Sequence, residues 1–171
     1  MENEIINRVQ SSSLVTLDLE ELYVPGERIF FDIKPFLFQE LILKEKDFRS
    51  SLKSNDWSEY TNKHVALGCT VEAIIPTWAY MLVAIALKPF AKTILFGSLP
   101  DLEKHLFRNS LSTINWGSFN QSKVVVKGCS KVEVPTEIYV EVAARLKDVA
   151  ASIMFGEACS TVPLFKRASQ A

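Results

Sequence analysis

The sequence predicts an α/β protein with three layers and a mainly parallel sheet of about five strands, of the Rossmann-like or flavodoxin-like type. One observation is a unit that reads helix, strand, helix, strand and occurs twice in tandem, at about residues 40–97 and 99–156. A second is that the strands are short apolar runs separated by helical segments. This pattern is typical of parallel strands joined by helical crossovers.

The repeat is visible as identical residues at a nearly constant offset. Phe48-Arg49 and Leu52 recur as Phe107-Arg108 and Leu111, 59 residues further along the chain. Self-similarity at a fixed period indicates a duplicated structural unit. Further matched pairs are Trp57 and Trp116, Gly68-Cys69 and Gly128-Cys129, Pro76-Thr77 and Pro135-Thr136, Tyr80 and Tyr139, and Phe96-Gly97 and Phe155-Gly156.

Each predicted element follows from its local pattern. The N-terminal residues predict a helix at Glu2–Gln10 and a strand at Leu14–Leu19, the strand lying antiparallel at an edge. A strand at Arg28–Asp32 precedes the first unit. Pro-Thr opens the second helix of each unit, because proline is tolerated in a first helical turn. The paired ranges are Glu40–Ser54 and Leu99–Thr113, His64–Leu67 and Val124–Lys127, Pro76–Ala91 and Pro135–Ala150, and Ile94–Gly97 and Ile153–Gly156.

Length and composition bound the class of protein. The 171 residues predict a single domain, residues 1–171, and 48% apolar content is ordinary for a globular chain. The net charge is −1 and the basic residues form no block, which argues against nucleic-acid binding. The longest uncharged run, Ala73–Leu87, is too short to span a membrane. We see no export signal and expect a cytoplasmic protein with reduced cysteines.

The second helix differs between the two units. Pro76–Leu87 carries no charged residue, whereas its counterpart contains Glu137, Glu141 and Arg145. A helix that is apolar on every side needs cover on every side. We therefore predict a homodimer that uses this helix, with cover by the N-terminal segment as the alternative. The predicted interface residues are Trp78, Met81, Leu82 and Ile85.

Three cysteines follow predicted strands. Cys69, Cys129 and Cys159 would all lie at the carboxyl edge of one parallel sheet, where ligands bind in such folds. A hydroxyl residue follows each of them, and the two Pro-Thr helices begin nearby. Residues expected to contribute to an anion site or to surround the thiols are Thr70, Ser130, Ser160, Thr77 and Thr136.

Three thiols at one point predict an iron–sulfur cluster or a thiophilic metal such as zinc. Structural zinc normally takes four protein ligands, and neither His64 nor His105 is well placed to be the fourth. The alternatives are an α/β enzyme that binds a small molecule or anion and has a cysteine nucleophile, and a non-catalytic interaction module. Whether the chain is an enzyme stays open. Buried cysteines also pack simply as small apolar residues. No glycine-rich nucleotide fingerprint occurs.

Five segments spread over the chain carry a resemblance to a known family: TLDLEELY (Thr16–Tyr23), EKDFR (Glu45–Arg49), IIPTWAYML (Ile74–Leu82), VVVKGC (Val124–Cys129) and GEACSTVPLFKR (Gly156–Arg167). By these segments the chain resembles a bacterial family designated domain of unknown function 2480. The resemblance implies proximity to iron–sulfur cluster assembly genes, and hence iron–sulfur assembly proteins as partners and a role in cluster assembly or sulfur handling.

Overall fold

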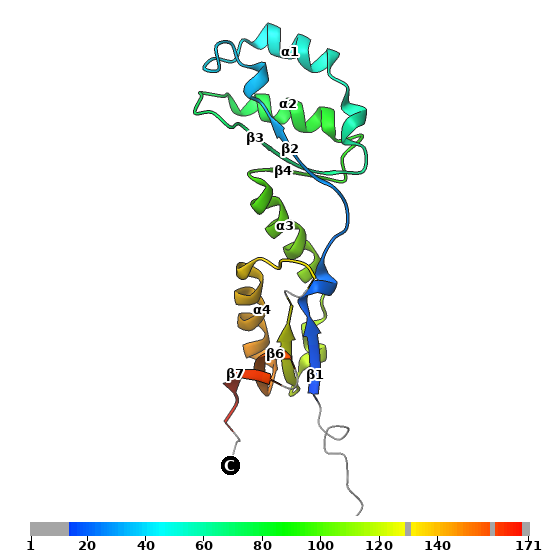
Figure 1. The fold of residues 1–171 in the computed structure, drawn as a ribbon, viewed down its shortest axis with the longest axis vertical. Coiled ribbons are helices and arrows are strands. Elements are labelled where there is room, and N and C mark those ends of the chain that lie inside the picture. The colour runs from blue at the N-terminus through cyan, green and yellow to red at the C-terminus, as the bar shows by residue number, and fades with distance from the viewer. Residues whose placement is uncertain (1–13, 129–130, 158–159, 169–171) are drawn as a thin grey trace, which may run out of the picture. The chain divides into compact units, whose positions relative to one another are not determined.

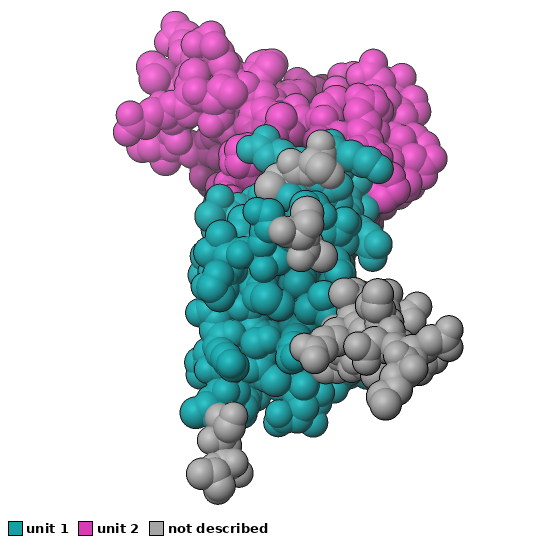
Figure 2. Space-filling model, turned by 60° about the horizontal axis from the view of Figure 1, so that its bottom comes forward, with its two compact units in different colours: residues 1–24, 107–171 teal, residues 25–106 magenta. Residues whose placement is uncertain are grey.

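The structure is a computed structural model, and it describes residues 14–128, 131–157 and 160–168. The chain forms two compact units, coloured separately in Figure 2. Unit 2 is the continuous segment 25–106. Unit 1 combines residues 1–24 with residues 107–171. Unit 2 is thus inserted, in the order of the chain, between two parts of unit 1.

Both units are mixed α/β, as predicted, and most strand pairs are parallel (Figure 1). Unit 2 holds a three-stranded sheet in the order β2-β3-β4, and unit 1 a four-stranded sheet in the order β1-β5-β6-β7. The strands are β1 Leu14–Asp18, β2 Arg28–Asp32, β3 His64–Gly68, β4 Thr93–Phe96, β5 Lys123–Lys127, β6 Ser152–Glu157 and β7 Ser160–Lys166. The α-helices are α1 Glu45–Ser54, α2 Thr77–Leu87, α3 Leu99–Leu111 and α4 Thr136–Val149, and the 3₁₀ helices are Leu19–Leu22, Lys34–Phe36, Trp57–Tyr60 and Trp116–Phe119.

The prediction of one sheet of about five strands was wrong. The five predicted strands exist, but they divide between two sheets, so a single Rossmann-like or flavodoxin-like sheet does not form. The reason is the partner of β1: it pairs in parallel with β5, where an antiparallel edge strand was predicted. Strand β7, which pairs antiparallel with β6, was not predicted. The predicted N-terminal helix Glu2–Gln10 lies outside the described residues.

In unit 2, both helices pack on one face of the sheet (Figure 1). Phe48 of α1 and Val83 of α2 are fully buried in one apolar cluster with Val65 and Leu67 of β3. Alternate residues of a strand point to opposite faces, so a strand with Val65 and Leu67 inward must present its other residues to the opposite face. On that opposite face of the sheet, Arg28 of β2 forms an ion pair with Glu103 of α3.

Unit 1 buries its core in the corresponding way. Phe107 and Leu111 of α3 occupy the positions of Phe48 and Leu52, and they pack with α4 and with the β5 residues Val124 and Val126. The same helical face is therefore apolar in both units, as expected for amphipathic helices that cover a sheet.

Equivalent backbone contacts are present in the two units. Asp56 accepts a hydrogen bond from the Ser58 amide, and Asn115 accepts one from the Gly117 amide, so each begins a 3₁₀ helix in the same way. The two strands that close the repeats each have a glycine with positive φ at their end: Gly97, directly after β4, at 146°, and Gly156, the penultimate residue of β6, at 117°. A left-handed backbone at this place favours glycine. The duplication seen in the sequence is therefore also a duplication of local structure.

The likeness extends to a part of the chain that the sequence repeat did not include. β1 and β2 each end in an aspartate, Asp18 or Asp32, whose carboxylate accepts the amide two residues later, in the first turn of a 3₁₀ helix. Asp18 is the N-cap of its helix, and Asp32 directly precedes the N-cap Ile33. The next residues, Leu19 and Ile33, are fully buried. Each unit therefore receives an N-terminal strand and 3₁₀ helix of the same kind before its first α-helix.

Two predicted helices are longer than the observed ones for local reasons. α1 begins at Glu45 and not at Glu40, because Gln39 and Glu40 adopt positive φ values of 51° and 58°. α2 ends at Leu87 because proline at position 89 cannot continue a helix. Pro76 and Pro135 each lie at the N-cap, directly before the helix they were predicted to open.

The repeat predicts equal stability effects at equivalent core positions. Phe48→Ala and Phe107→Ala each remove a fully buried ring, so each is expected to lower the free energy of unfolding by ~3–5 kcal/mol. Phe38→Ala, at a ring that is 46% exposed, is the control and is expected to lower it by less than ~1 kcal/mol. Chemical denaturation of the three variants measures these values. An effect at Phe48 no larger than at Phe38 would contradict the assigned core.

Candidate functional site

The outer edge of β4 is the main structural difference between the two units. β4 is the last strand of its sheet, and within the described residues it pairs only with β3. Its counterpart β6 pairs with β5 on one side and with β7 on the other. The amide of Gly97 donates to the carbonyl of Leu67 on β3. Since successive residues of a strand alternate in direction, the backbone groups of Ile94 and Phe96 face the open edge.

An apolar groove runs between α2 and β4. One part, of about 420 Å³, is lined by residues that include Met81, Ile94 and Phe96. A second part, of about 510 Å³, is lined by residues that include Ile85, Lys88 and Ile94. Ala84 and Ile94 line both parts. The groove therefore follows the open strand edge, and we call it the α2–β4 groove.

Three large apolar side chains at this groove are exposed to solvent. Met81 is 60% exposed, and Ile85 and Phe96 are each 68% exposed. Of the four residues predicted for a dimer interface, Met81 and Ile85 thus lie on the surface. Trp78 and Leu82 pack against the core of unit 2, where the Trp78 ring makes an edge contact with Phe48. The uncharged helix is therefore covered on one side and open on the other.

In unit 1, strand β7 fills the corresponding position. Phe165 lies opposite Ile153, the counterpart of Ile94, and packs against the core of unit 1. The ammonium of Lys147, the counterpart of Lys88, lies 4.4 Å from the centroid of the Phe165 ring. The Arg167 amide donates to the Ala151 carbonyl and continues the ladder. Unit 1 thus shows how an antiparallel strand with an aromatic residue occupies this site.

The strand end beside Cys69 carries a small polar cluster. Cys69 is partly buried directly after β3. The next residue, Thr70, donates from its amide to Asp32 Oδ1 at 3.1 Å and from its hydroxyl to Asp32 Oδ2. The amide of Lys34 also donates to Asp32 Oδ1, at 2.9 Å. Burial acts to raise the pKa of Asp32, but these hydrogen bonds outweigh it and hold the pKa below its ordinary value.

A tyrosine approaches the strand end in each unit. Burial and the nearby Cys69 raise the pKa of the Tyr80 hydroxyl. In unit 1, a Cβ atom at Gly128 would lie 2.6 Å from the Tyr139 oxygen, so this approach requires glycine before Cys129. Cys129, Ser130 and Cys159 themselves lie outside the described residues.

The remaining predicted site residues lie at the starts of two helices and one strand. Thr77 and Thr136 are the exposed first residues of α2 and α4, and Ser160 is the exposed first residue of β7. Cys69 follows a strand of the unit 2 sheet, whereas Cys129 and Cys159 come after strands of the unit 1 sheet. The premise that one sheet edge collects all three thiols is therefore lost. Cys69 is the only thiol among the described residues, and no group of three potential metal ligands occurs among them.

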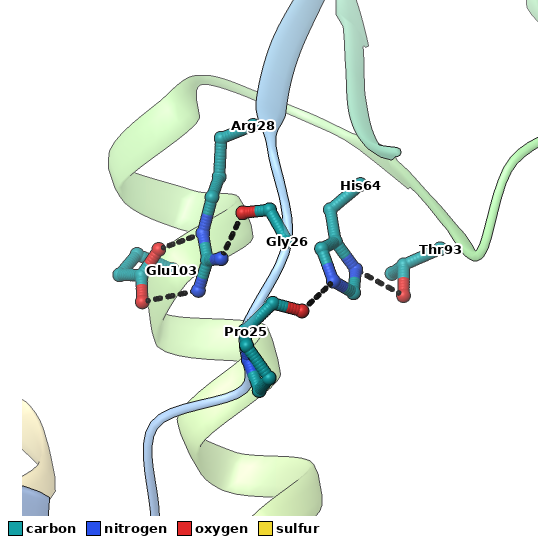
Figure 3. Close-up of polar contacts among 6 residues, drawn as sticks. All are labelled: Pro25, Gly26, Arg28, His64, Thr93 and Glu103. Atoms are coloured by element: carbon teal, nitrogen blue, oxygen red, sulfur yellow. Dashed lines mark hydrogen bonds and ion pairs between the residues drawn. The ribbon is translucent and has the colours of Figure 1, made fainter. Parts of the chain in front are cut away.

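His64 begins β3, at the end of the strand opposite Cys69, and both of its ring nitrogens contact other residues (Figure 3). It is 2% exposed, and its ring nitrogens lie 3.0 Å from the Thr93 hydroxyl and 3.2 Å from the Pro25 carbonyl. Arg28 binds both carboxylate oxygens of Glu103 close by, at 2.8 and 3.0 Å. Both nitrogens of His64 therefore have protein partners, which agrees with its exclusion as a ligand next to Cys69.

Sequence reasoning missed the aspartates at the ends of β1 and β2. Asp18 forms a 3.0 Å ion pair with Lys127, just before the Gly128-Cys129 pair, and Asp32 binds Thr70 just after Cys69. The available signal was the position of both residues, each a single carboxylate at the end of an apolar strand. The pairing of β1 with β5 and of β2 with β3 places each aspartate beside a strand that precedes a Gly-Cys pair.

The fold and these strand ends define a two-unit, mixed α/β protein with a duplicated core. The profile of the family described as protein of unknown function (DUF2480) matches residues 3–167, so the chain belongs to this family. No curated protein and no solved structure matches the chain. In the part of the chain that the structure describes, no helix is long and apolar enough to cross a membrane.

The lowered pKa of Asp32 predicts a pH-dependent contribution to stability. The ionised carboxylate is stabilised in the folded state, so its contribution is complete above the ordinary pKa of 3.8 and is lost as the pH falls through the lower folded-state pKa. Asp32→Asn is therefore expected to be less stable than the wild type at about pH 7, and the difference shrinks at about pH 3. Urea unfolding at both pH values measures this difference.

A second variant removes one hydrogen bond to Asp32 and leaves the Asp32 side chain in place. Thr70→Val removes the hydroxyl that donates to Asp32, so the pKa of the Asp32 carboxyl is expected to rise toward 3.8 in an NMR titration. An unchanged titration curve would show that the hydroxyl does not stabilise the carboxylate.

Proposed function

We propose that the protein is a non-catalytic interaction module that binds an extended segment as an additional strand on β4. The segment would run antiparallel to β4 and place an aromatic side chain in the α2–β4 groove. Addition of a strand to an open sheet edge is a common mode of recognition, because the backbone supplies affinity and alternate side chains supply specificity.

One observation carries this proposal: the same edge is filled by β7 in unit 1 and has no partner strand among the described residues of unit 2. Exposed sheet edges are usually protected by charge, proline or a covering element. β4 reads Thr-Ile-Leu-Phe and has none of these residues, whereas β7 contains Pro163 and ends in Lys166. The exposed side chains of Met81, Ile85 and Phe96 add apolar surface beside the edge.

Hydrogen exchange at the open edge tests the proposal. The probe is a synthetic peptide with the sequence of residues 160–166, the strand that fills this position in unit 1. Binding of a strand, from the peptide or from another chain, is expected to slow exchange of the Ile94 and Phe96 amides by at least about tenfold. NMR of the full chain resolves these amides over a range of protein and peptide concentrations.

The control peptide replaces the phenylalanine that corresponds to Phe165 by alanine, and it is expected to protect the two amides less. Fast exchange at Ile94 and Phe96 under every condition, with and without the peptide, would exclude strand binding at this edge.

A second candidate function is favoured by the surroundings of the cysteines. We propose that Cys69, Cys129 and Cys159 bind an iron–sulfur cluster or a thiophilic metal such as zinc, in cytoplasmic cluster assembly or sulfur handling. The duplicated strand ends, with Gly-Cys, a neighbouring tyrosine and an aspartate, support a chemical role for Cys69 and Cys129. A single cysteine nucleophile acting on a small molecule or anion is the alternative use of the same residues.

Anaerobic purification tests the cluster directly. The wild-type protein is expected to contain iron and acid-labile sulfide and to absorb visible light, and the triple Cys→Ser variant is expected to lose both properties. Colourless, metal-free protein after incubation with ferrous iron and sulfide would exclude a cluster. Thiol-reactivity profiling distinguishes the alternative, because one highly reactive cysteine indicates a nucleophile whereas three equally protected cysteines indicate a shared ligand.

A further inference from the structure

We propose that the strand bound by β4 is β4 of a second copy of this chain. The two strands would run antiparallel about a two-fold axis at Leu95 and join the two three-stranded sheets into one. This inference rests on the proposed strand-binding function and names its partner. An isologous contact of this kind uses the same surface on both copies.

One residue pair of the register is taken from unit 1, where the pairing shifts by one residue between Ile153 and Met154. There Phe165 lies opposite Ile153, and Ile153 is the counterpart of Ile94. A two-fold axis at Leu95 places Phe96 of the second copy opposite Ile94 of the first. Residues directly opposite one another lie on the same face of a sheet, so the second ring faces the groove as Phe165 does. Phe96 is also the residue of β4 whose side chain is left 68% exposed.

The backbone geometry is compatible with this register. The groups of Ile94 and Phe96 face the open edge, because the Gly97 amide is bonded to β3. Ile94 of one copy and Phe96 of the other therefore form a hydrogen-bonded pair, and the symmetry repeats that pair on the other side of Leu95. The two Leu95 residues form the central pair without direct hydrogen bonds.

The side chains around the register are also compatible. Lys88 lines the groove at the position of Lys147, whose ammonium lies over the Phe165 ring. The same arrangement over Phe96 of the second copy would give a cation–π contact. Lys92 of one copy falls opposite Ser98 of the other, so no two lysines meet. α2 and β4 contain no charged residue, and the charges beside the groove are those of Lys88 and Lys92.

Sedimentation of the full chain tests the second copy as partner. At micromolar concentration the wild type is expected to sediment at twice the 19.3 kDa chain mass. Met81→Lys and Phe96→Asp place charges in the interface and are each expected to weaken dimerisation by at least about tenfold. Val140→Lys is the matched control: Val140 is the counterpart of Met81 on α4 and is 66% exposed, and this variant is expected to remain dimeric.

The outcomes separate this inference from the function on which it rests. A wild-type monomer at all concentrations, with peptide protection at Ile94 and Phe96, would overturn the second copy as partner and retain strand binding. A dimer that Met81→Lys and Phe96→Asp leave intact would overturn the proposed interface. Circular dichroism and thermal unfolding of each variant show that loss of the dimer is not loss of the fold.

Discussion

The need of every strand for hydrogen-bonding partners on both sides determines how this structure is arranged. An open parallel sheet built from strand–helix–strand units leaves two outer strands with unpaired backbone groups. In unit 1 the chain turns back after β6 and satisfies one edge with β7. In unit 2 it continues from β4 into α3 instead. The equivalent helices also differ in composition: α4 carries charge on its surface, whereas α2 presents apolar side chains beside the edge of β4.

The duplicated contacts show which parts of the unit the fold requires. Each copy has an aspartate or asparagine cap before its second 3₁₀ helix, a glycine with positive φ at the end of the strand that closes the repeat, and a buried phenylalanine in its first helix. The interactions that are not duplicated include the pairing of β6 with β7 and the ion pair of Asp18 with Lys127, whereas Asp32 binds Thr70. These are the places where the two units have room to differ in function.

The sequence predicted helices and strands more accurately than it predicted which strands pair. The ranges of β2 and β5 and the existence of the four paired helices were predicted well, because apolar periodicity and Pro-Thr starts are local signals. The pairing of β1 with β5 was not, because strand pairing depends on contacts between residues more than 100 positions apart, such as Leu14 and Lys123. β7 was missed because Pro163 lowers its resemblance to a strand. The α2–β4 groove is bounded by an edge that no other strand among the described residues covers, and strand pairing has no local signal, so only the uncharged helix pointed to the groove.

The insertion of unit 2 between β1 and the rest of unit 1 imposes an order on biosynthesis. Residues 25–106 form a continuous segment, so unit 2 has all its strands once this segment has left the ribosome. β1 is made first, yet its partner β5 is made only after the whole of unit 2. A nascent chain therefore carries an unpaired N-terminal strand throughout the synthesis of its first complete sheet, and in that interval this strand is exposed to chaperones and to neighbouring chains.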